Sequence, residues 1–544
     1  MKQKHKYPRS SGVLLPITAL HGPFGVGVLG AEALEFIDFL SECGFHTWQV
    51  LPVENTGGCF SPYKCISTYA GEPMLIDPRM LEEMGLVYDH EVEERKWGVS
   101  EESVNFELVR ERQWAILRKG YSRLEGAPYA EFNPPWLDNY ALYMALRHRY
   151  EDVPWYDWPD DDARSYDGET IRRAREDLAG EIKFYKFVQW LFDKQWKIVR
   201  DYAAERDITM FGDLPIYVSE DSVDVWSNRK LFDADANGNF LAVGGAPPDY
   251  FNPDGQLWGN PIYNWELLKS DGYKWWIDRM KGALGRYDVI RLDHFRGFES
   301  YWNIPATALT AREGEWVKGP GAAFFDALRK ELGDLPVIAE DLGDVDDDVI
   351  NLLEKSGFRG MRVLQFGLLG GDNSDDMHLP HSFSEGCIAY TGTHDNTTLL
   401  DCIFHLPWEE RDRALRYIGF DGDWTVGGPN CDINRVWIRA LFMSGASIVV
   451  IPIQDLLGYG GDTRTNTPGT PEGNWRFRIR SGVLEEIDAA FYADINKLYE
   501  RDNAVLPVSE DGAKGKGETP DEPEEPEAAD KAVIGKPRKR KKQP

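Results

Sequence analysis

Four acidic residues, each following a short apolar and strand-like run, constrain the fold more than any other feature of this chain. The runs and their acids are ITMFGD ending in Asp213, VIRLD ending in Asp293, PVIAE ending in Glu340, and IAYTGTH followed by Asp395. Any one of these acids is explained as well by an N-cap of the next helix. Four of them, two with His294 and His394 alongside, predict one shared site.

Eight strand-like runs alternate with amphipathic helical patterns, as in an α/β protein built from βα units. The predicted strands are Gly12–Pro16, Thr47–Pro52, Ile208–Gly212, Val289–Leu292, Val337–Ala339, Met361–Phe366, Ile388–Thr391 and Ser447–Ile453. The clearest predicted helices are Ala31–Cys43, Phe184–Arg206 and Phe324–Leu332. Eight parallel strands suit a closed (β/α)₈ TIM barrel, in which all strand ends meet on the face that carries the active site.

We expect residues 1–506 to form this catalytic barrel with its insertions. A stretch at roughly 80–180, rich in Trp, Tyr and charge, predicts an inserted and mostly helical subdomain. Segments 244–265 and 457–478 combine Pro, Gly and aromatic residues, which suits a stacking wall for a ligand as well as a packed loop. Residues 507–544 are poor in apolar side chains and predict a disordered tail, acidic and then basic.

The charge balance excludes some partners. The formal net charge is −30, and the last 38 residues hold 9 acids and 9 bases, so the imbalance belongs to the folded body. An acidic surface repels polyanions, which makes nucleic acid and acidic membranes poor partners. A neutral sugar meets no such repulsion. The 19 Trp residues agree with sugar stacking, although most Trp side chains simply fill protein cores.

The cysteines and the N-terminus predict a cytoplasmic protein. Six cysteines are scattered without a CxxC pair, which favours reduced thiols over a zinc site or a redox dithiol. No apolar run is long enough for a membrane helix. The apolar stretch Val13–Leu20 is too short, and too interrupted by Pro16 and Thr18, for a convincing signal peptide.

Two kinds of chemistry use such a cluster of acids. Divalent-metal hydrolysis needs Asp, Glu and His ligands, but the chain has no HxH or HExxH pattern. Glycosyl transfer needs one ionised carboxylate to attack the anomeric carbon and one protonated carboxyl to release the leaving oxygen. Arg291 shares its side of the strand with Asp293 and is expected to keep that aspartate ionised. Sugar chemistry is favoured, and the metal hydrolase stays an alternative.

Seven segments resemble the amylomaltases, the 4-α-glucanotransferases also called disproportionating enzymes. They are SPYKCISTYAG from Ser61, GDLPIYV from Gly212, APPDYFNPDGQLWGNPIYNW from Ala246, RLDHFRGFESYWNIP from Arg291, VIAEDLG from Val337, TGTHDNTT from Thr391 and NTPGTPEGNWRFR from Asn466. They occur in the family's order and span about Gly12 to Arg480. Tyr69, Glu72 and Arg229 depart from the family pattern of Phe, Asn and Pro, which bears on subsite detail only.

The resemblance implies a role for each matching residue. Asp293 would be the nucleophile that forms a β-linked glucosyl-enzyme, and Glu340 would be the general acid/base. Asp395 would hold the sugar hydroxyls and help to distort the ring. The residues implied in substrate binding are Ser61, Tyr63, Asp213, Tyr250, Phe251, Gln256, Trp258, Arg291, His294, His394 and Asn466.

The resemblance also implies a (β/α)₈ barrel without a C-terminal β-sandwich, and no metal or organic cofactor. The expected activity is retaining transfer of segments from an α-1,4-glucan donor to a glucose or maltooligosaccharide acceptor, by a monomer or weak homo-oligomer. An amylase-type hydrolase and a catalytically inactive glycan-binding protein are the alternatives.

Overall fold

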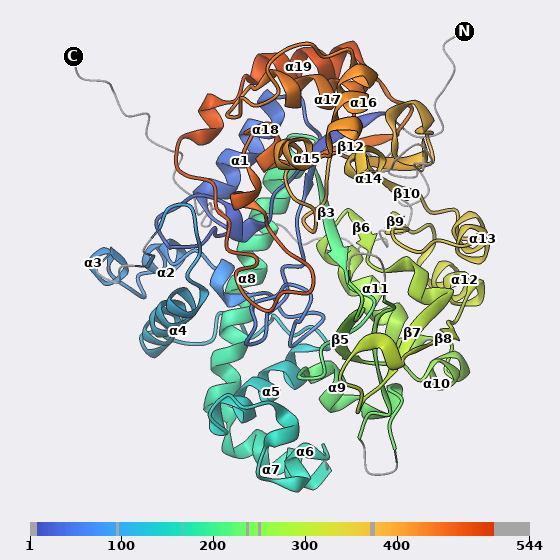
Figure 1. The fold of residues 1–544 in the computed structure, drawn as a ribbon. Helices are drawn as coiled ribbons and strands as arrows, with labels where there is room; N and C mark the ends of the chain where they lie inside the picture. The colour runs from blue at the N-terminus through green and yellow to red at the C-terminus, as the bar shows by residue number, and fades with distance from the viewer. Residues whose placement is uncertain are drawn as a thin grey trace, which may run out of the picture.

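A barrel of eight parallel strands forms the centre of the molecule (Figure 1). The computed structural model describes residues 8–93, 97–98, 100–166, 168–235, 239–248, 252–369 and 376–504. The barrel strands are β1 (Ser10–Leu14), β2 (Thr47–Gln49), β3 (Thr209–Leu214), β6 (Val289–Leu292), β9 (Val337–Ala339), β10 (Gly360–Val363), β11 (Cys387–Tyr390) and β12 (Ile448–Pro452). All eight predicted strands are confirmed, with ends shifted by a few residues.

Pairing between the strands closes the barrel. They are hydrogen-bonded in the order β10-β11-β12-β1-β2-β3-β6-β9. A parallel bridge between Ile338 of β9 and Arg359, just before β10, joins the two ends of that order. The predicted TIM barrel is therefore confirmed.

The inside of the barrel is a packed apolar core, as the fold requires. Its members include Leu14, Leu51, Phe211, Val289, Ile338, Met361, Ile388 and Ile448. Side chains alternate across a strand, so residues two or four positions further along face the same interior. The polar residues placed in this way above the core are Asp213, Arg291, Asp293 and Glu340. The period-two pattern of β3, β6 and β9 thus carries these groups to the carboxyl end of the barrel.

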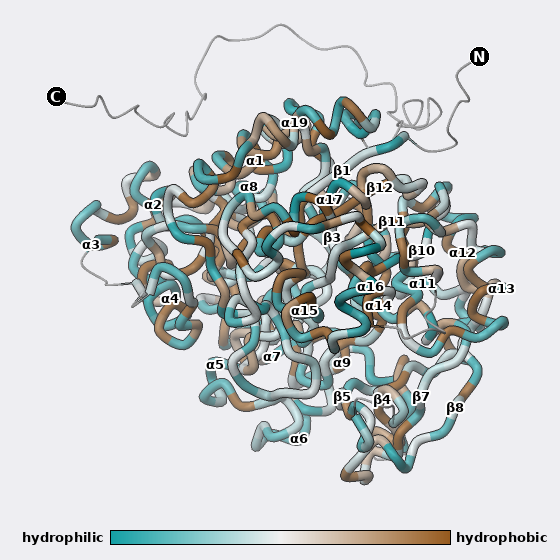
Figure 2. Tube along the Cα trace, turned by 45° about the horizontal axis from the view of Figure 1, so that its top comes forward, coloured by the Kyte–Doolittle hydropathy of each residue, from teal (hydrophilic) through white to brown (hydrophobic). Residues whose placement is uncertain are grey.

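Helices surround the barrel and bury their apolar faces against it. They are α1 (Ala31–Glu42), α8 (Ala179–Ala204), α11 (Lys274–Arg286), α12 (Ala322–Leu332), α13 (Asp347–Ser356), α14 (Leu364–Leu369), α17 (Asp432–Met443) and α19 (Ala489–Leu498). Figure 2 shows hydrophobic and hydrophilic residues alternating along them, as amphipathic helices require. The three helices named from the sequence are confirmed as α1, α8 and α12.

The connection from β2 to β3 is long and helical. It holds α2 (Arg79–Glu83), α3 (Asp89–Glu93), α4 (Phe106–Ser122), α5 (Leu137–Arg149), α6 (Asp161–Arg164) and α7 (Gly168–Asp177) before α8 returns to the barrel. In Figure 1, α2, α3 and α4 lie on the left, and α5, α6 and α7 lie at the bottom of the molecule. They fall in the stretch where the sequence predicts a helical insertion.

A four-stranded antiparallel sheet, which the sequence pattern did not predict, is inserted at the lower right of Figure 1. Its order is β5 (Gln256–Pro261), β4 (Ala242–Ala246), β7 (Ser300–Pro305) and β8 (Glu315–Lys318). Part of segment 244–265, expected to be loop, is thus paired strand. Glycine and proline are rare in strands, so this composition indicated a loop. Here glycine lets the backbones of β4 and β5 approach closely, because a Cβ on Gly245 would lie 2.1 Å from the Gln256 carbonyl oxygen.

After β12, the described residues up to Ala504 contain helices and turns but no further strand. Among the described helices, none combines the length and the apolar character needed to cross a bilayer. All six cysteines are free thiols. The tail predicted to be disordered, 507–544, lies outside the described residues.

Candidate active site

The buried guanidinium of Arg291 lies among three of the four acids. Its Nη1 atom is 2.9 and 2.7 Å from the two carboxylate oxygens of Asp213 and 2.8 Å from Oδ1 of Asp293. Its Nη2 atom is 4.0 Å from Oε2 of Glu340. These acids are far apart in the sequence, but their strands β3, β6 and β9 are neighbours in the barrel. The structure therefore brings the three carboxyl groups into one site around Arg291, which is called the cleft from here on.

Glu340 is nearly buried and is held by two backbone groups. The N–H of His294 donates to Oε2 at 2.8 Å, and the N–H of Leu342 donates to Oε1 at 3.0 Å. Burial raises the pKa of Glu340 to about 8; the Arg291 guanidinium opposes this shift and the Asp293 charge adds to it. The carboxyl group is therefore protonated at neutral pH. It can supply a proton to a nearby oxygen.

The residue after Asp293 connects the two carboxylates. His294 has a φ of 51°, in the left-handed region that non-glycine residues seldom occupy, and this turn aims its N–H at Glu340. Burial lowers the pKa of His294 to about 4, so the imidazole is neutral. Its buried Nε2 has no hydrogen-bond partner within the described residues, and the Trp258 ring packs edge-on at 4.9 Å. That nitrogen is a buried polar atom left without a partner beside the Trp258 ring, which calls for an explanation.

A hydrogen-bonded row forms the floor of the cleft. The hydroxyl of Tyr63 donates to Oδ2 of Asp213 at 2.8 Å and lies 2.8 Å from Nε2 of His394. Because that hydroxyl has one proton, it accepts from the imidazole, and His394 carries its proton on Nε2. Burial raises the pKa of Asp213 to about 7, against the lowering by Arg291, and burial lowers the pKa of His394. The row fixes the position of Arg291.

Asp395 lies at the other end of this row and is partly exposed. Its Oδ1 accepts a hydrogen bond from Nδ2 of Asn466 at 2.6 Å, and its Oδ2 is 3.4 Å from Nε2 of His394. The side chain of Arg464 donates to its backbone carbonyl oxygen. The fourth acid is thus connected to the other three through His394 and Tyr63.

The remaining predicted binding residues lie on segments outside the barrel strands, with Gln256 and Trp258 on β5 and Ser61 in the connection after β2. Trp258 of β5 donates from Nε1 to Oε1 of Gln256 at 3.0 Å. The hydroxyl of Ser61 accepts from the N–H of Tyr63 at 3.3 Å and so fixes the turn that carries the tyrosine. Tyr250 and Phe251 lie outside the described residues.

Three further residues shape this site and were not singled out from the sequence. Arg464 holds the backbone of Asp395, as described above, and the Trp475 ring lies 5.8 Å from Tyr63 and 6.0 Å from His394. Buried Asp455 accepts from Oγ1 of Thr391 at 2.5 Å and from the N–H of Leu399 at 2.7 Å, which closes the loop bearing Asp395. Asp455 follows strand β12, just as the other four acids follow their strands. An acid after an apolar, strand-like run could therefore have identified it from the sequence.

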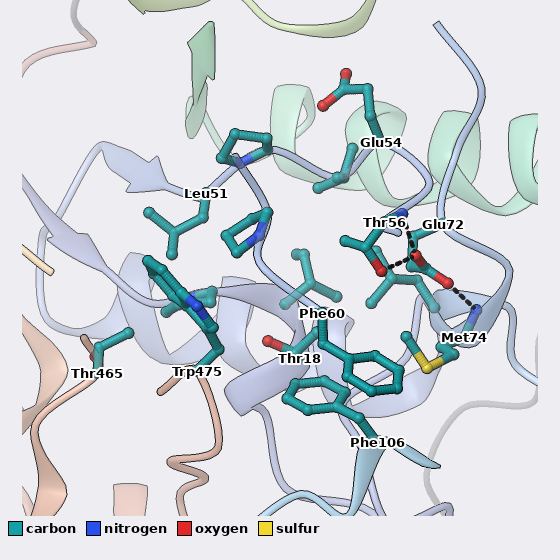
Figure 3. Close-up of a pocket in the computed structure, with 16 residues that line it drawn as sticks. Thr18, Leu51, Glu54, Thr56, Phe60, Glu72, Met74, Phe106, Thr465 and Trp475 are labelled. Atoms are coloured by element: carbon teal, nitrogen blue, oxygen red, sulfur yellow. Dashed lines mark hydrogen bonds between the residues drawn. The ribbon is translucent and has the colours of Figure 1, made fainter. Parts of the chain in front are cut away.

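An apolar pocket adjoins the cleft at Trp475 (Figure 3). It has an open volume of about 510 Å³, and its walls include Leu51, Phe60, Phe106 and Thr465. At the edge of the pocket, the carboxylate of Glu72 accepts hydrogen bonds from the N–H groups of Thr56 at 2.7 Å and of Met74 at 3.1 Å. Trp475 therefore forms a wall shared by the polar cleft and this apolar pocket.

The arrangement supplies two of the groups that retaining glycosyl transfer needs. One carboxylate, Asp293, lies beside a fixed cation, and its neighbour, Glu340, is kept protonated by burial. In the described part of the chain, no group of three or more His, Cys, Asp or Glu side chains is arranged to hold a metal ion.

Comparisons with known proteins agree with this chemistry. A family model described as 4-alpha-glucanotransferase matches residues 15–484. The 4-alpha-glucanotransferase of Streptococcus pneumoniae is 39% identical over 507 residues, which cover 92% of this chain and 98% of that protein. The enzyme of the same name from Thermus thermophilus is 40% identical over 490 residues, 88% of this chain and 96% of the relative.

Solved structures are similar as well. Amylomaltase from Streptococcus agalactiae, in complex with acarbose, superposes with a TM-score of 0.86 at 35% identity, covering 91% of this chain and 99% of that chain. Amylomaltase from Corynebacterium glutamicum gives a TM-score of 0.73 at 17% identity, over 91% of this chain and 75% of that one, which shows a shared fold.

Proposed function

The chain belongs to the 4-alpha-glucanotransferase family, and from that premise we propose how its cleft carries out the transfer. The enzyme is a retaining 4-α-glucanotransferase that moves α-1,4-glucan segments between maltooligosaccharides. One observation supports our assignment of roles above all others. The ion pair of Arg291 with Asp293, and the hydrogen bond from the N–H of His294 to Glu340, hold the two carboxyl groups beside each other.

In the first step, a carboxylate oxygen of Asp293 attacks C1 of the donor glucose, and the C1–O4 bond breaks. The proton of Glu340 goes to the departing O4, and the released glucan leaves with a free 4-hydroxyl. The product is a β-linked glucosyl ester on Asp293, because attack inverts the anomeric carbon. Asp395, His394 and the unpaired Nε2 of His294 are assigned to the hydroxyls of this glucose.

In the second step, Glu340 has become a carboxylate and acts as the base. It takes the proton from the 4-hydroxyl of an acceptor, whose oxygen bonds to C1 while the ester C1–O bond breaks. Asp293 is regenerated as a carboxylate, and the second inversion restores the α configuration.

Transfer competes with hydrolysis at this second step. Effective molarities of positioned groups reach on the order of 10⁵ M, far above that of liquid water, so a well-held acceptor can exceed water as the attacking group. We assign Trp258 and Gln256 to binding of the acceptor. The indole N–H of Trp258 donates to the amide oxygen of Gln256, and the indole ring packs on His294. The donor is proposed to be an α-1,4-glucan, the acceptor glucose or a maltooligosaccharide, and the free thiols favour a cytoplasmic site of action.

Incubation with maltotriose tests this function. The wild-type enzyme should yield glucose and maltopentaose first. Trp258→Ala should raise the ratio of hydrolysis to transfer by about tenfold, because the loss of an aromatic contact weakens acceptor binding by up to roughly tenfold. Chromatography of the products measures both rates. Trp258→Phe, which keeps an aromatic ring, is the matched control. Hydrolysis without longer oligomers in the wild type would contradict the assignment, and an unchanged ratio in Trp258→Ala would remove the role given to this ring.

A further inference from the structure

An exposed aromatic cluster lies in the insertion between β11 and β12. It consists of Phe404 on α15 (Leu399–His405), Trp408 at the start of α16 (Trp408–Ile418), and Trp424 and Val426 in the following loop. Phe404 is 54% exposed, Trp408 71% and Val426 55%, whereas Trp424 is partly buried and packs against the core. Single exposed apolar residues are ordinary on protein surfaces, but three of them lie within 23 residues of chain, around the ring contact of Phe404 with Trp424, and exposed apolar patches usually have a function.

The cluster is braced as a rigid surface. The guanidinium of Arg411 lies 4.2 Å from the centre of the Trp424 ring and donates to the carbonyl oxygen of Phe404 at 3.0 Å. The rings of Phe404 and Trp424 are 5.9 Å apart and tilted by 59°. Asp423 accepts from the N–H and the hydroxyl of Thr425, at 2.9 and 2.6 Å, and fixes the turn that carries Trp424. Rings held in place before binding lose little conformational entropy when a ligand stacks on them.

The cluster is connected directly to the catalytic cleft. α15 begins four residues after Asp395, and the N–H of its first residue, Leu399, is held by Asp455. A helix rises about 1.5 Å per residue, so Phe404 lies within roughly 10 Å of that anchor along the helix axis. In Figure 2, α15 is mostly hydrophobic and lies beside the largely hydrophilic α16. The helix that carries Phe404 therefore begins next to the loop that carries Asp395.

The composition of the surface favours a neutral, ring-containing ligand. Flat aromatic faces stack on the apolar faces of pyranose rings, and Asp423, Thr425 and His405 place polar groups beside them. α16 is charged on its outer turns, and the formal net charge of −30 repels anionic membranes and polyanions. Resting on the proposed function, we propose that the exposed rings of Phe404 and Trp408, with Trp424 packed beneath Phe404, form an auxiliary binding surface for the α-1,4-glucan chain, outside the cleft.

Retardation in gels that contain soluble amylose tests this surface, with maltotriose turnover measured in parallel. The double variant Phe404→Ala/Trp408→Ala should bind amylose about three- to tenfold more weakly, because aromatic contacts are lost, while its kcat and KM for maltotriose stay within about twofold. Trp408→Tyr should retain most of the retardation. Tyr88→Ala is the matched control, since Tyr88 is 60% exposed and lies between α2 and α3, at the far left of Figure 1.

The other outcomes separate a failure of this binding surface from a failure of the proposed function. Unchanged retardation of the double variant would exclude the surface as a glucan site. A parallel loss of maltotriose turnover would place the effect in the cleft or the fold. A change in sedimentation of the double variant, without a change in amylose binding, would identify an interface between two copies of the chain. A wild-type enzyme that binds amylose but leaves maltotriose unchanged would contradict the proposed function and leave the binding surface standing.

Discussion

Asp293→Asn is expected to lower the rate of maltotriose disproportionation by on the order of 10⁴-fold or more, the scale on which the loss of a catalytic nucleophile is felt. The amide has nearly the same size, so the cleft keeps its shape, but it cannot attack C1. The ion pair with Arg291 at 2.8 Å is lost as well. Binding of maltotriose should change far less than turnover, and kcat and KM determined separately would show this.

The same strand supplies the control for that variant. Asp288 precedes β6 at the amino end of the barrel, where it pairs with Arg200 at 2.7 Å and accepts from the N–H of Met210 at 2.8 Å. That face of a TIM barrel serves stability and not catalysis. Asp288→Asn should therefore lower the melting temperature and leave kcat nearly unchanged. Comparable activity losses in the two variants would show that the charge lost at Asp293 acts through folding.

Glu340→Gln is expected to slow transfer from maltotriose by about 10²–10⁴-fold, the usual contribution of a general acid. In the wild type, the pKa of about 8 means that Glu340 loses its proton as the pH rises through that value. The rate of glucosyl-enzyme formation should therefore fall on the alkaline side, and this fall should be absent in Glu340→Gln. Rates measured with maltotriose between pH 6 and about 9.5 would show the difference.

The leaving group separates proton donation from structural damage. Fluoride departs without a proton, so Glu340→Gln should form the glycosyl-enzyme from α-maltosyl fluoride nearly as fast as the wild type. Glu354→Gln, an exposed glutamate on α13, is the control and should change neither reaction. Equal losses with maltotriose and with the fluoride would rule out Glu340 as the acid.

The barrel could be predicted because its signals are local. Each strand is an apolar run with an acid or a turn at its end, and the helices between them have clear amphipathic spacing. The inserted sheet could not be predicted in this way. β4 contains two adjacent glycines, and β5 contains Gly259 and Pro261, so propensity favours a loop. Pairing of β4 with β5 on one side and with β7 on the other decides the conformation instead.

In the candidate site, too, the features with local sequence signals could be predicted and those that depend on distant residues could not. The position of Asp213, Asp293 and Glu340 at the strand ends could be predicted, because alternation and barrel closure bring such residues together. The left-handed turn at His294 and the side-chain brace from Arg464 to Asp395 could not, since both depend on partners distant in the sequence. The raised pKa of Glu340 follows from its burial, which an apolar run alone does not reveal.

Mass spectrometry of the trapped intermediate tests most directly whether Asp293 and Glu340 act on one sugar carbon. Glu340→Gln, mixed with α-maltosyl fluoride without an acceptor and quenched in acid, should accumulate a maltosyl ester, because the base for the second step is missing. After digestion, the added mass is expected on the peptide that contains Asp293, and Asp293→Asn in the same background should carry none. Sugar attached to a different carboxylate, or fluoride release with no attached sugar in the Glu340→Gln variant, would contradict the assignment.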